Sequence, residues 1–152
     1  MGLVYFVMME KFYKIIILPY AFALLYMMFF AFGREQYSEH IVRLMPIVST
    51  FEFVKNSYSL KSIIINILGN IIMFMPFGAL SWLNPKWANF KTLVIHFLSV
   101  MVVIEAVQYF ARRGVFDVDD LLLNTFGLWL GFLLHRKWTK INTDFPLFSS
   151  EK

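Results

Sequence analysis

Apolar residues along the chain fall into four long stretches, which cover residues 15–32, 62–83, 90–111 and 118–135. Each stretch is close to the roughly 20 residues that an α-helix needs to cross the hydrocarbon core of a bilayer. Backbone polar groups find no water in lipid, so apolar stretches of this length satisfy them by forming helices. We therefore predict an all-α membrane protein with four transmembrane helices in an antiparallel bundle.

The connections between the apolar stretches differ in length. Residues 33–61 form a long polar loop, whereas residues 84–89 and 112–117 are short turns that make neighbouring helices antiparallel. Basic residues are slightly more numerous at the helix ends on the side of the N-terminus, which favours a cytoplasmic location for both termini. We expect an N-terminal cytoplasmic segment (1–14), a membrane domain (15–135) with an extracellular loop (33–61), and a cytoplasmic tail (136–152).

Composition supports the membrane assignment and excludes several other classes. The chain has 152 residues, of which 59% are hydrophobic and 19% aromatic, and it contains no cysteine. A disulfide or a thiolate metal site is therefore impossible. The net charge of +4 suits a nucleic-acid-binding protein, but the lysines and arginines lie mostly at the edges of apolar stretches. The expected partner is the lipid bilayer, and we predict no nucleic acid.

Three of the predicted helices carry a polar stripe, because residues three or four apart lie on one helical face. The stripes consist of Asn66 and Asn70 in the second helix, Glu105, Gln108 and Arg112 in the third, and Asp120 and Asn124 in the fourth. The order of the helices places all three stripes toward one side of the membrane. The long loop lies on the same side.

Glu105 is the polar residue that is hardest to explain by packing alone. A charged side chain deep in the bilayer costs roughly 2.5 kcal/mol or more, so Glu105 should face the bundle and have a partner. Together with Asp120, nearby amides and an arginine, it could hold a polar headgroup, polarise it or exchange protons with it. We take Glu105 and Asp120 as candidate catalytic residues.

Other polar and small residues have simpler interpretations. Asp117 and Asp119 suit the N-terminal cap and first turn of the fourth helix. The asparagines of the second helix could serve only to form hydrogen bonds with a neighbouring helix. Gly127 and Gly131 form a GxxxG pattern, which lets two helices approach closely. Pro76 predicts a kink whose freed carbonyl is bonded by a neighbour.

The sequence gives little support for a metal or cofactor site. Its three histidines are scattered and lack a metal-ligand spacing. A carboxylate site for Mg²⁺ or Ca²⁺ on Glu105, Asp117 and Asp120 is a weaker alternative. We predict no metal and no cofactor. Because phosphate-binding, dinucleotide and nucleophile-elbow motifs are also missing from the sequence, it leaves open whether the protein is an enzyme.

The segments "NILGNIIMFMPFGAL", "EAVQ" and "RGVFDVDDLLLNTFGLWLG" resemble the VanZ-like family of small bacterial membrane proteins, over residues 44–133. The matching positions are Asn66, Asn70, Pro76, Gly78, Glu105, Gln108, Arg113, Asp117, Asp120, Asn124, Gly127 and Gly131. Arg112 lies on the same helical face as Glu105 and Gln108, which favours it as the arginine of the family pattern. The local sequence "RGVFD" favours Arg113. In the loop, "LMPIVS" resembles an Asn-Leu-x-Pro-Phe element of the family, with Arg43 and Ile47 replacing its asparagine and phenylalanine.

This resemblance implies a multi-pass protein of the bacterial cell membrane, in a family named for a protein linked to teicoplanin resistance. The amides and charges of the polar stripes, at the level of the lipid headgroups, favour binding or modification of an amphipathic ligand, either a lipid-linked envelope molecule or an antibiotic. The candidate ligand-binding residues are Asn66, Asn70, Gln108, Arg112, Arg113, Asp117 and Asn124. One alternative is an enzyme that acts on a lipid-linked cell-wall precursor or teichoic-acid lipid through Glu105 and Asp120. A second is a small transporter or structural bundle, and the oligomeric state stays open.

Overall fold

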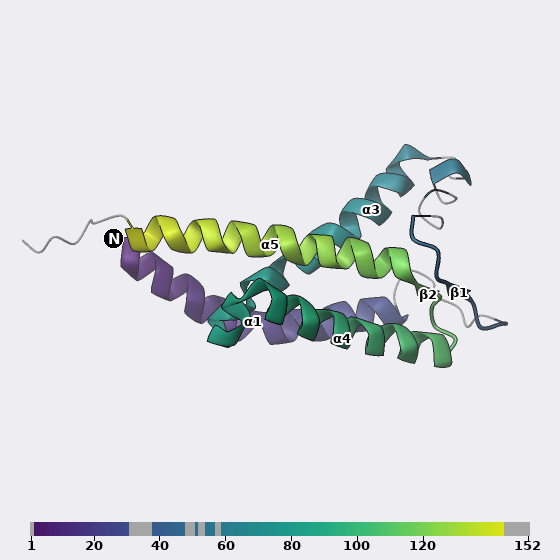
Figure 1. The fold of residues 1–152 in the computed structure, drawn as a ribbon, viewed down its shortest axis with the longest axis horizontal. Coiled ribbons are helices and arrows are strands. Elements are labelled where there is room, and N and C mark those ends of the chain that lie inside the picture. Colours follow the sequence, from purple (N-terminus) through teal and green to yellow (C-terminus); the bar gives the residue numbers. More distant parts are fainter. Residues whose placement is uncertain (1, 31–37, 48–50, 52–53, 57–58, 145–152) are drawn as a thin grey trace, which may run out of the picture.

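The computed structural model describes residues 2–30, 38–47, 51, 54–56 and 59–144. Its helices are α1 (Gly2–Phe30), α3 (Leu60–Phe74), α4 (Phe90–Phe110) and α5 (Val118–Asp144), with 3₁₀-helices η1 (Met75–Trp82) and η2 (Pro85–Ala88). Two short strands, β1 (Val42–Arg43) and β2 (Phe116–Asp117), pair in parallel. In Figure 1, α5 begins beside the end of α4 and returns along it, and the strand pair lies at that end.

Within the described residues, three helical segments are long and apolar enough to cross a membrane: Phe6–Phe30, Ile63–Trp82 and Phe90–Phe110. The chain is therefore a largely helical membrane protein. The predicted fourth span falls on α5, which is less apolar because Asp119, Asp120 and Asn124 lie in its first two turns. Helix α1 starts at Gly2, well before residue 15, since the apolar residues ahead of Glu10 continue the helix. Helix α5 likewise continues past residue 135 to Asp144.

The second apolar stretch changes from α-helix to 3₁₀-helix at Pro76. Proline has no N–H, so the carbonyl of Met73 lacks the donor that residue 76 would supply in a 3₁₀-helix. The hydroxyl of Tyr20 donates to this carbonyl at 2.7 Å, and the hydroxyl of Tyr13 donates to the carbonyl of Pro76 at 2.9 Å. The prediction that a neighbour bonds the freed carbonyl is confirmed, and the donors come from α1.

Helix α5 approaches the second stretch backbone to backbone. A Cβ added to Gly127 would collide with the carbonyl oxygen of Ile71, and one added to Gly131 would collide with that of Met75. On the opposite side of the contact, a Cβ on Gly78 would meet the backbone of α5. The packing role predicted for the GxxxG pattern is confirmed, because only hydrogen atoms fit between these chains.

Apolar side chains fill the middle of the molecule. The buried core consists of Leu24 of α1, Phe74 of α3, Leu93, Phe97 and Met101 of α4, and Leu128 and Phe132 of α5. On α4 the same buried face continues toward the end of the helix as Glu105 and Gln108. The polar residues of interest therefore lie where this core meets the junction of α4 and α5.

Candidate functional site

The junction between α4 and α5 is tied to the loop that precedes α3. Val42 of β1 pairs with Phe116 of β2, and Arg43 pairs with Asp117. The backbone N–H of Phe116 also donates to the carbonyl of Ile41 at 3.1 Å. A segment far away in the sequence is thereby fixed beside the first turn of α5.

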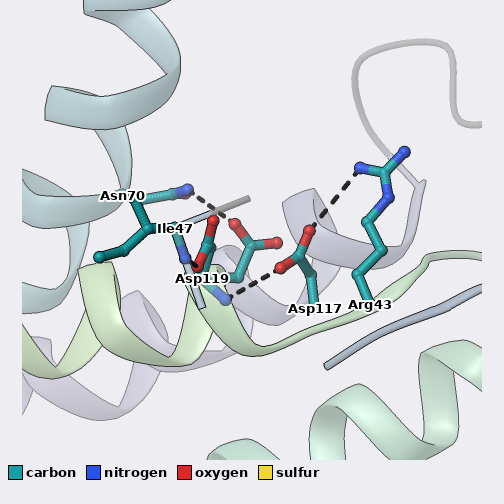
Figure 2. Close-up of polar contacts among 6 residues, drawn as sticks. Arg43, Ile47, Asn70, Asp117 and Asp119 are labelled. Atoms are coloured by element: carbon teal, nitrogen blue, oxygen red, sulfur yellow. Dashed lines mark hydrogen bonds and ion pairs between the residues drawn. The ribbon is translucent and has the colours of Figure 1, made fainter. Parts of the chain in front are cut away.

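Asp117 combines a helix cap with an ion pair (Figure 2). Its Oδ1 accepts a hydrogen bond from the backbone N–H of Asp119 at 2.9 Å, which satisfies a donor at the start of α5. Its Oδ2 lies 3.7 Å from a guanidinium nitrogen of Arg43. The capping role predicted for Asp117 is confirmed, and the ion pair adds a link to β1.

Asp119 holds the loop in addition to opening the helix. Its side chain is only 4% exposed and accepts a hydrogen bond from the backbone N–H of Ile47, as Figure 2 shows. Ile47 has a φ of 71°, so the chain turns sharply at this point. The contact uses the backbone N–H of Ile47, which any residue except proline would supply.

Helices α3 and α5 meet through a pair of polar side chains. The amide of Asn70 donates to the Oδ1 of Asp120 at 3.3 Å, and Figure 2 shows Asn70 pointing toward the first turns of α5. Asp120 is partly buried. Asn66 lies one turn earlier on α3, and its side chain lies outside the described part of the structure.

Three further predicted residues are buried deeper in the bundle. Glu105, Gln108 and Asn124 are each 2% exposed. The amide of Gln108 donates to the carbonyl of Met28 at 2.8 Å, which joins α4 to α1. At about 1.5 Å of rise per residue, Glu105 and Asn124 both lie about 8–9 Å from the junction end of their helices. They therefore occupy a similar depth on neighbouring helices.

The two candidate arginines occupy different environments. Arg112 is exposed and has a φ of 54°. Arg113 is partly buried, and its guanidinium lies 5.4 Å from the centroid of the Phe30 ring, within the range of a cation–π contact. The arginine that forms an ion pair with Asp117 is Arg43, whose side chain is 50% exposed. Helical periodicity could not predict this pair, because Arg43 lies outside the helices.

The histidines lie apart from one another. His40 Nδ1 is 2.9 Å from the carbonyl of Tyr109 at the protein surface, whereas His135 lies near Ser81 and Thr139 far along α5. Among the described residues, no group of three histidine, aspartate or glutamate side chains is placed to hold a metal ion. The chemistry available at the junction end is that of carboxylates, amides and the guanidinium groups of Arg43 and Arg113.

We use the term polar cluster for the buried or partly buried carboxylates and amides at this end, apart from Gln108, whose amide bonds the carbonyl of Met28. Its members are Asn70, Glu105, Asp117, Asp119, Asp120 and Asn124. They come from three helices and from Asp117 of β2, and the contacts of Asp117 and Asp119 add the loop that precedes α3. Such a group can accept hydrogen bonds, neutralise a cation and exchange protons.

The polar cluster lies entirely within a recognised family region. The family model for VanZ/LLP1 matches residues 17–139, which is most of the chain. The chain belongs to the VanZ/LLP1 family. It is 32% identical over 68 residues to the protein named Protein VanZ from Enterococcus faecium, a match that covers 45% of this chain and 42% of that protein. This VanZ/LLP1 chain thus matches less than half the length of its relative. No solved structure gives a significant match.

Proposed function

We propose that this VanZ/LLP1 protein binds the headgroup of an amphipathic envelope molecule at the polar cluster, while the apolar tail lies against the outer faces of the helices. The observation that carries the proposal is the burial of Glu105 on the core-facing side of α4. Apolar residues of similar volume would generally give an equally stable or more stable interior than a buried carboxylate. A cost of this kind is understandable where the charge serves a ligand.

We also propose that α5 is the fourth membrane span, which would complete an antiparallel bundle. This helix has 27 residues, enough for about 40 Å. Asp119 and Asn124 are buried against the protein, so lipid would not meet these two polar side chains. The positive-inside rule then supports cytoplasmic termini and a polar cluster on the outer side.

Cysteine labelling tests this topology, because the chain has no cysteine of its own. Suitable exposed positions are Ser59 before α3, Ala88 before α4 and Lys137 late in α5. An impermeant maleimide should label Ser59→Cys in intact cells, and should label Ala88→Cys and Lys137→Cys only after permeabilisation. The reverse pattern would show the opposite orientation. Labelling of Lys137→Cys and Ala88→Cys from different sides would exclude α5 as a span.

The family resemblance supports a contribution to resistance against teicoplanin-type glycopeptides. Glu105→Gln keeps the size of the side chain and much of its hydrogen bonding but removes the charge. In a strain that lacks the native gene, it should lose most of the protection against teicoplanin at wild-type levels of membrane protein. Glu39→Gln makes the same chemical change at an exposed loop position and should retain protection. Full protection by Glu105→Gln would refute a functional role for the cluster.

A catalytic version of the proposal is favoured by the Asn70–Asp120 hydrogen bond, because an amide at 3.3 Å fixes the orientation of the Asp120 carboxylate. Lipid extracts of strains with and without the protein separate the two versions. A modified envelope lipid that disappears in both Glu105→Gln and Asp120→Asn would support an enzyme. Protection with unchanged lipids would support binding alone.

A further inference from the structure

A buried hydrogen-bond donor lies at the end of the bundle opposite the polar cluster. The indole Nε1 of Trp82 is covered by the protein and donates no hydrogen bond to any described residue. Buried donors are nearly always paired, because an unpaired one loses its hydrogen bonds to water without a replacement. A phenylalanine would offer an aromatic ring without this cost, so the N–H requires an explanation of its own.

Three aromatic rings hold the indole of Trp82 in place. Phe6 and Tyr13 of α1 and His135 of α5 lie edge to face with it, at centroid distances of 5.9, 5.2 and 4.7 Å. His135 is itself 3.4 Å from the hydroxyl of Ser81. An N–H directed at the face of a ring is a weak, second-order interaction. The rings therefore fix the direction of the indole N–H but do not replace a true acceptor.

The position of Trp82 along the chain places it at a membrane surface. It ends the apolar segment Ile63–Trp82, and Phe6, whose ring it contacts, begins the segment Phe6–Phe30. In Figure 1 the start of α1 lies at the same end as the late part of α5. Phospholipids present phosphate and ester-carbonyl oxygens at this level, where the N–H of a tryptophan usually finds its acceptor.

Exposed basic side chains lie at the same end of the molecule. Lys86 of η2 and Arg136 and Lys137 of α5 are all exposed. The acidic Glu10 of α1 is already held in an ion pair with Lys14. Positive charges near a membrane surface attract anionic lipids, and a hydrogen bond to a charged acceptor is stronger than one to a neutral carbonyl. A phosphate therefore fits this end better than an ester carbonyl.

We propose that this end of the bundle binds the phosphate of an anionic phospholipid, with Trp82 Nε1–H donating to a phosphate oxygen. Lys86, Arg136 and Lys137 balance the negative charge, and the acyl chains lie against the helices. Trp82 as a whole is only partly buried, so a small shift of side chains brings its N–H to the surface. This site is separate from the polar cluster and does not depend on the function proposed there.

Three probes separate the phosphate from the rest of the lipid: phosphatidylglycerol, diacylglycerol with the same acyl chains, and inorganic phosphate. Their binding is measured by native mass spectrometry with the full chain in micelles of a neutral detergent. Phosphatidylglycerol should bind at least about tenfold more tightly than diacylglycerol, which keeps the ester carbonyls but lacks the phosphate. An excess of inorganic phosphate should not displace phosphatidylglycerol, because it has no acyl chains to hold it at the membrane surface.

A substitution at position 82 shows whether the lipid uses the indole N–H. Trp82→Phe keeps an aromatic ring and should weaken phosphatidylglycerol binding about tenfold to a hundredfold, as expected for a hydrogen bond to a charged group. Its binding of diacylglycerol should not change. Trp87→Phe is the control and should retain binding, because it makes the same change in another tryptophan at this end, whose ring contacts His96.

The N–H can also be observed directly by NMR of the ¹⁵N-labelled wild-type protein. The chain has four tryptophans, so the indole signal of Trp82 is the one left after Trp→Phe variants at positions 87, 129 and 138 assign the others. Phosphatidylglycerol should move this proton signal downfield, and further than that of Trp87. An unmoved Trp82 signal would overturn the proposal, even where Trp82→Phe fails to fold.

The binding measurements can overturn the proposal in three further ways. Equal affinity for phosphatidylglycerol and diacylglycerol would show that the phosphate is not recognised. Displacement by inorganic phosphate would show a site for the free anion and not for a lipid. Tight phosphatidylglycerol binding by correctly folded Trp82→Phe would show that the basic side chains alone attract the lipid.

Discussion

The contact between α5 and the second apolar stretch makes Gly131→Ala a severe test of the fold. The new methyl group would meet the main-chain carbonyl of Met75, and a main chain cannot rotate away as a side chain can. Alanine gains about 1 kcal/mol of helix propensity over glycine. Overpacking costs typically 1–3 kcal/mol, and a collision with backbone belongs at or above the upper end. The expected net loss is therefore about 2 kcal/mol of the free energy of unfolding.

Gly69→Ala is a matched control within the same helix pair. A Cβ on Gly69 would lie 3.8 Å from the terminal methyl of Met73, an ordinary van der Waals distance. This substitution should therefore stabilise the protein by up to about 1 kcal/mol. Denaturant unfolding of both variants in detergent micelles, followed by circular dichroism, measures the difference. If Gly131→Ala proves as stable as Gly69→Ala, the backbone contact between α5 and η1 does not exist.

Two further predictions concern the supports around the site. Tyr20→Phe should lower the free energy of unfolding by about 1 kcal/mol, because the Met73 carbonyl loses its hydrogen bond. The loss should be smaller in a Pro76→Ala background, where the backbone N–H of residue 76 can donate to this carbonyl. A double-mutant cycle in micelles measures both losses, and equal losses in the two backgrounds would contradict the assignment. Ile47→Gly should relieve the cost of a φ of 71° while keeping the N–H that bonds Asp119, whereas Ile47→Pro loses that donor and cannot adopt this φ. Limited proteolysis of the loop should therefore be faster only in Ile47→Pro, and equal rates in all forms would show that this contact does not hold the loop.

Helical periodicity predicts the features that repeat along an apolar stretch. It locates the membrane helices and the shared face of Glu105 and Gln108, because a polar residue that continues an apolar face must be buried with it. The close packing at Gly127 and Gly131 follows from small residues four positions apart. The ends of the helices are predicted less well, since α1 and α5 continue through sequence of mixed polarity.

The loop contacts could not be predicted in the same way. Two strands of two residues each are too short to show an alternating pattern, so the pairing of β1 with β2 leaves no trace in the sequence. The N–H of Ile47 is a backbone donor that any residue except proline would supply. In the sequence, Arg43 is an ordinary charged residue of the loop and Asp119 is an ordinary aspartate in the first turn of a helix. Only the fold shows that Arg43 pairs with Asp117 and that Asp119 bonds the backbone of Ile47.

The 3₁₀ conformation of η1 changes which of its residues share a face. With three residues per turn, Met75, Gly78 and Ser81 line up in one row, and all three contact α5: Met75 and Gly78 through backbone around Gly131, and Ser81 through a contact with His135 at 3.4 Å. In a regular α-helix, six residues turn through about 600° and not 720°, so Ser81 would point about 120° away from Met75. The 3₁₀-helix at Pro76 thus keeps one row of residues against α5 from Met75 to Ser81.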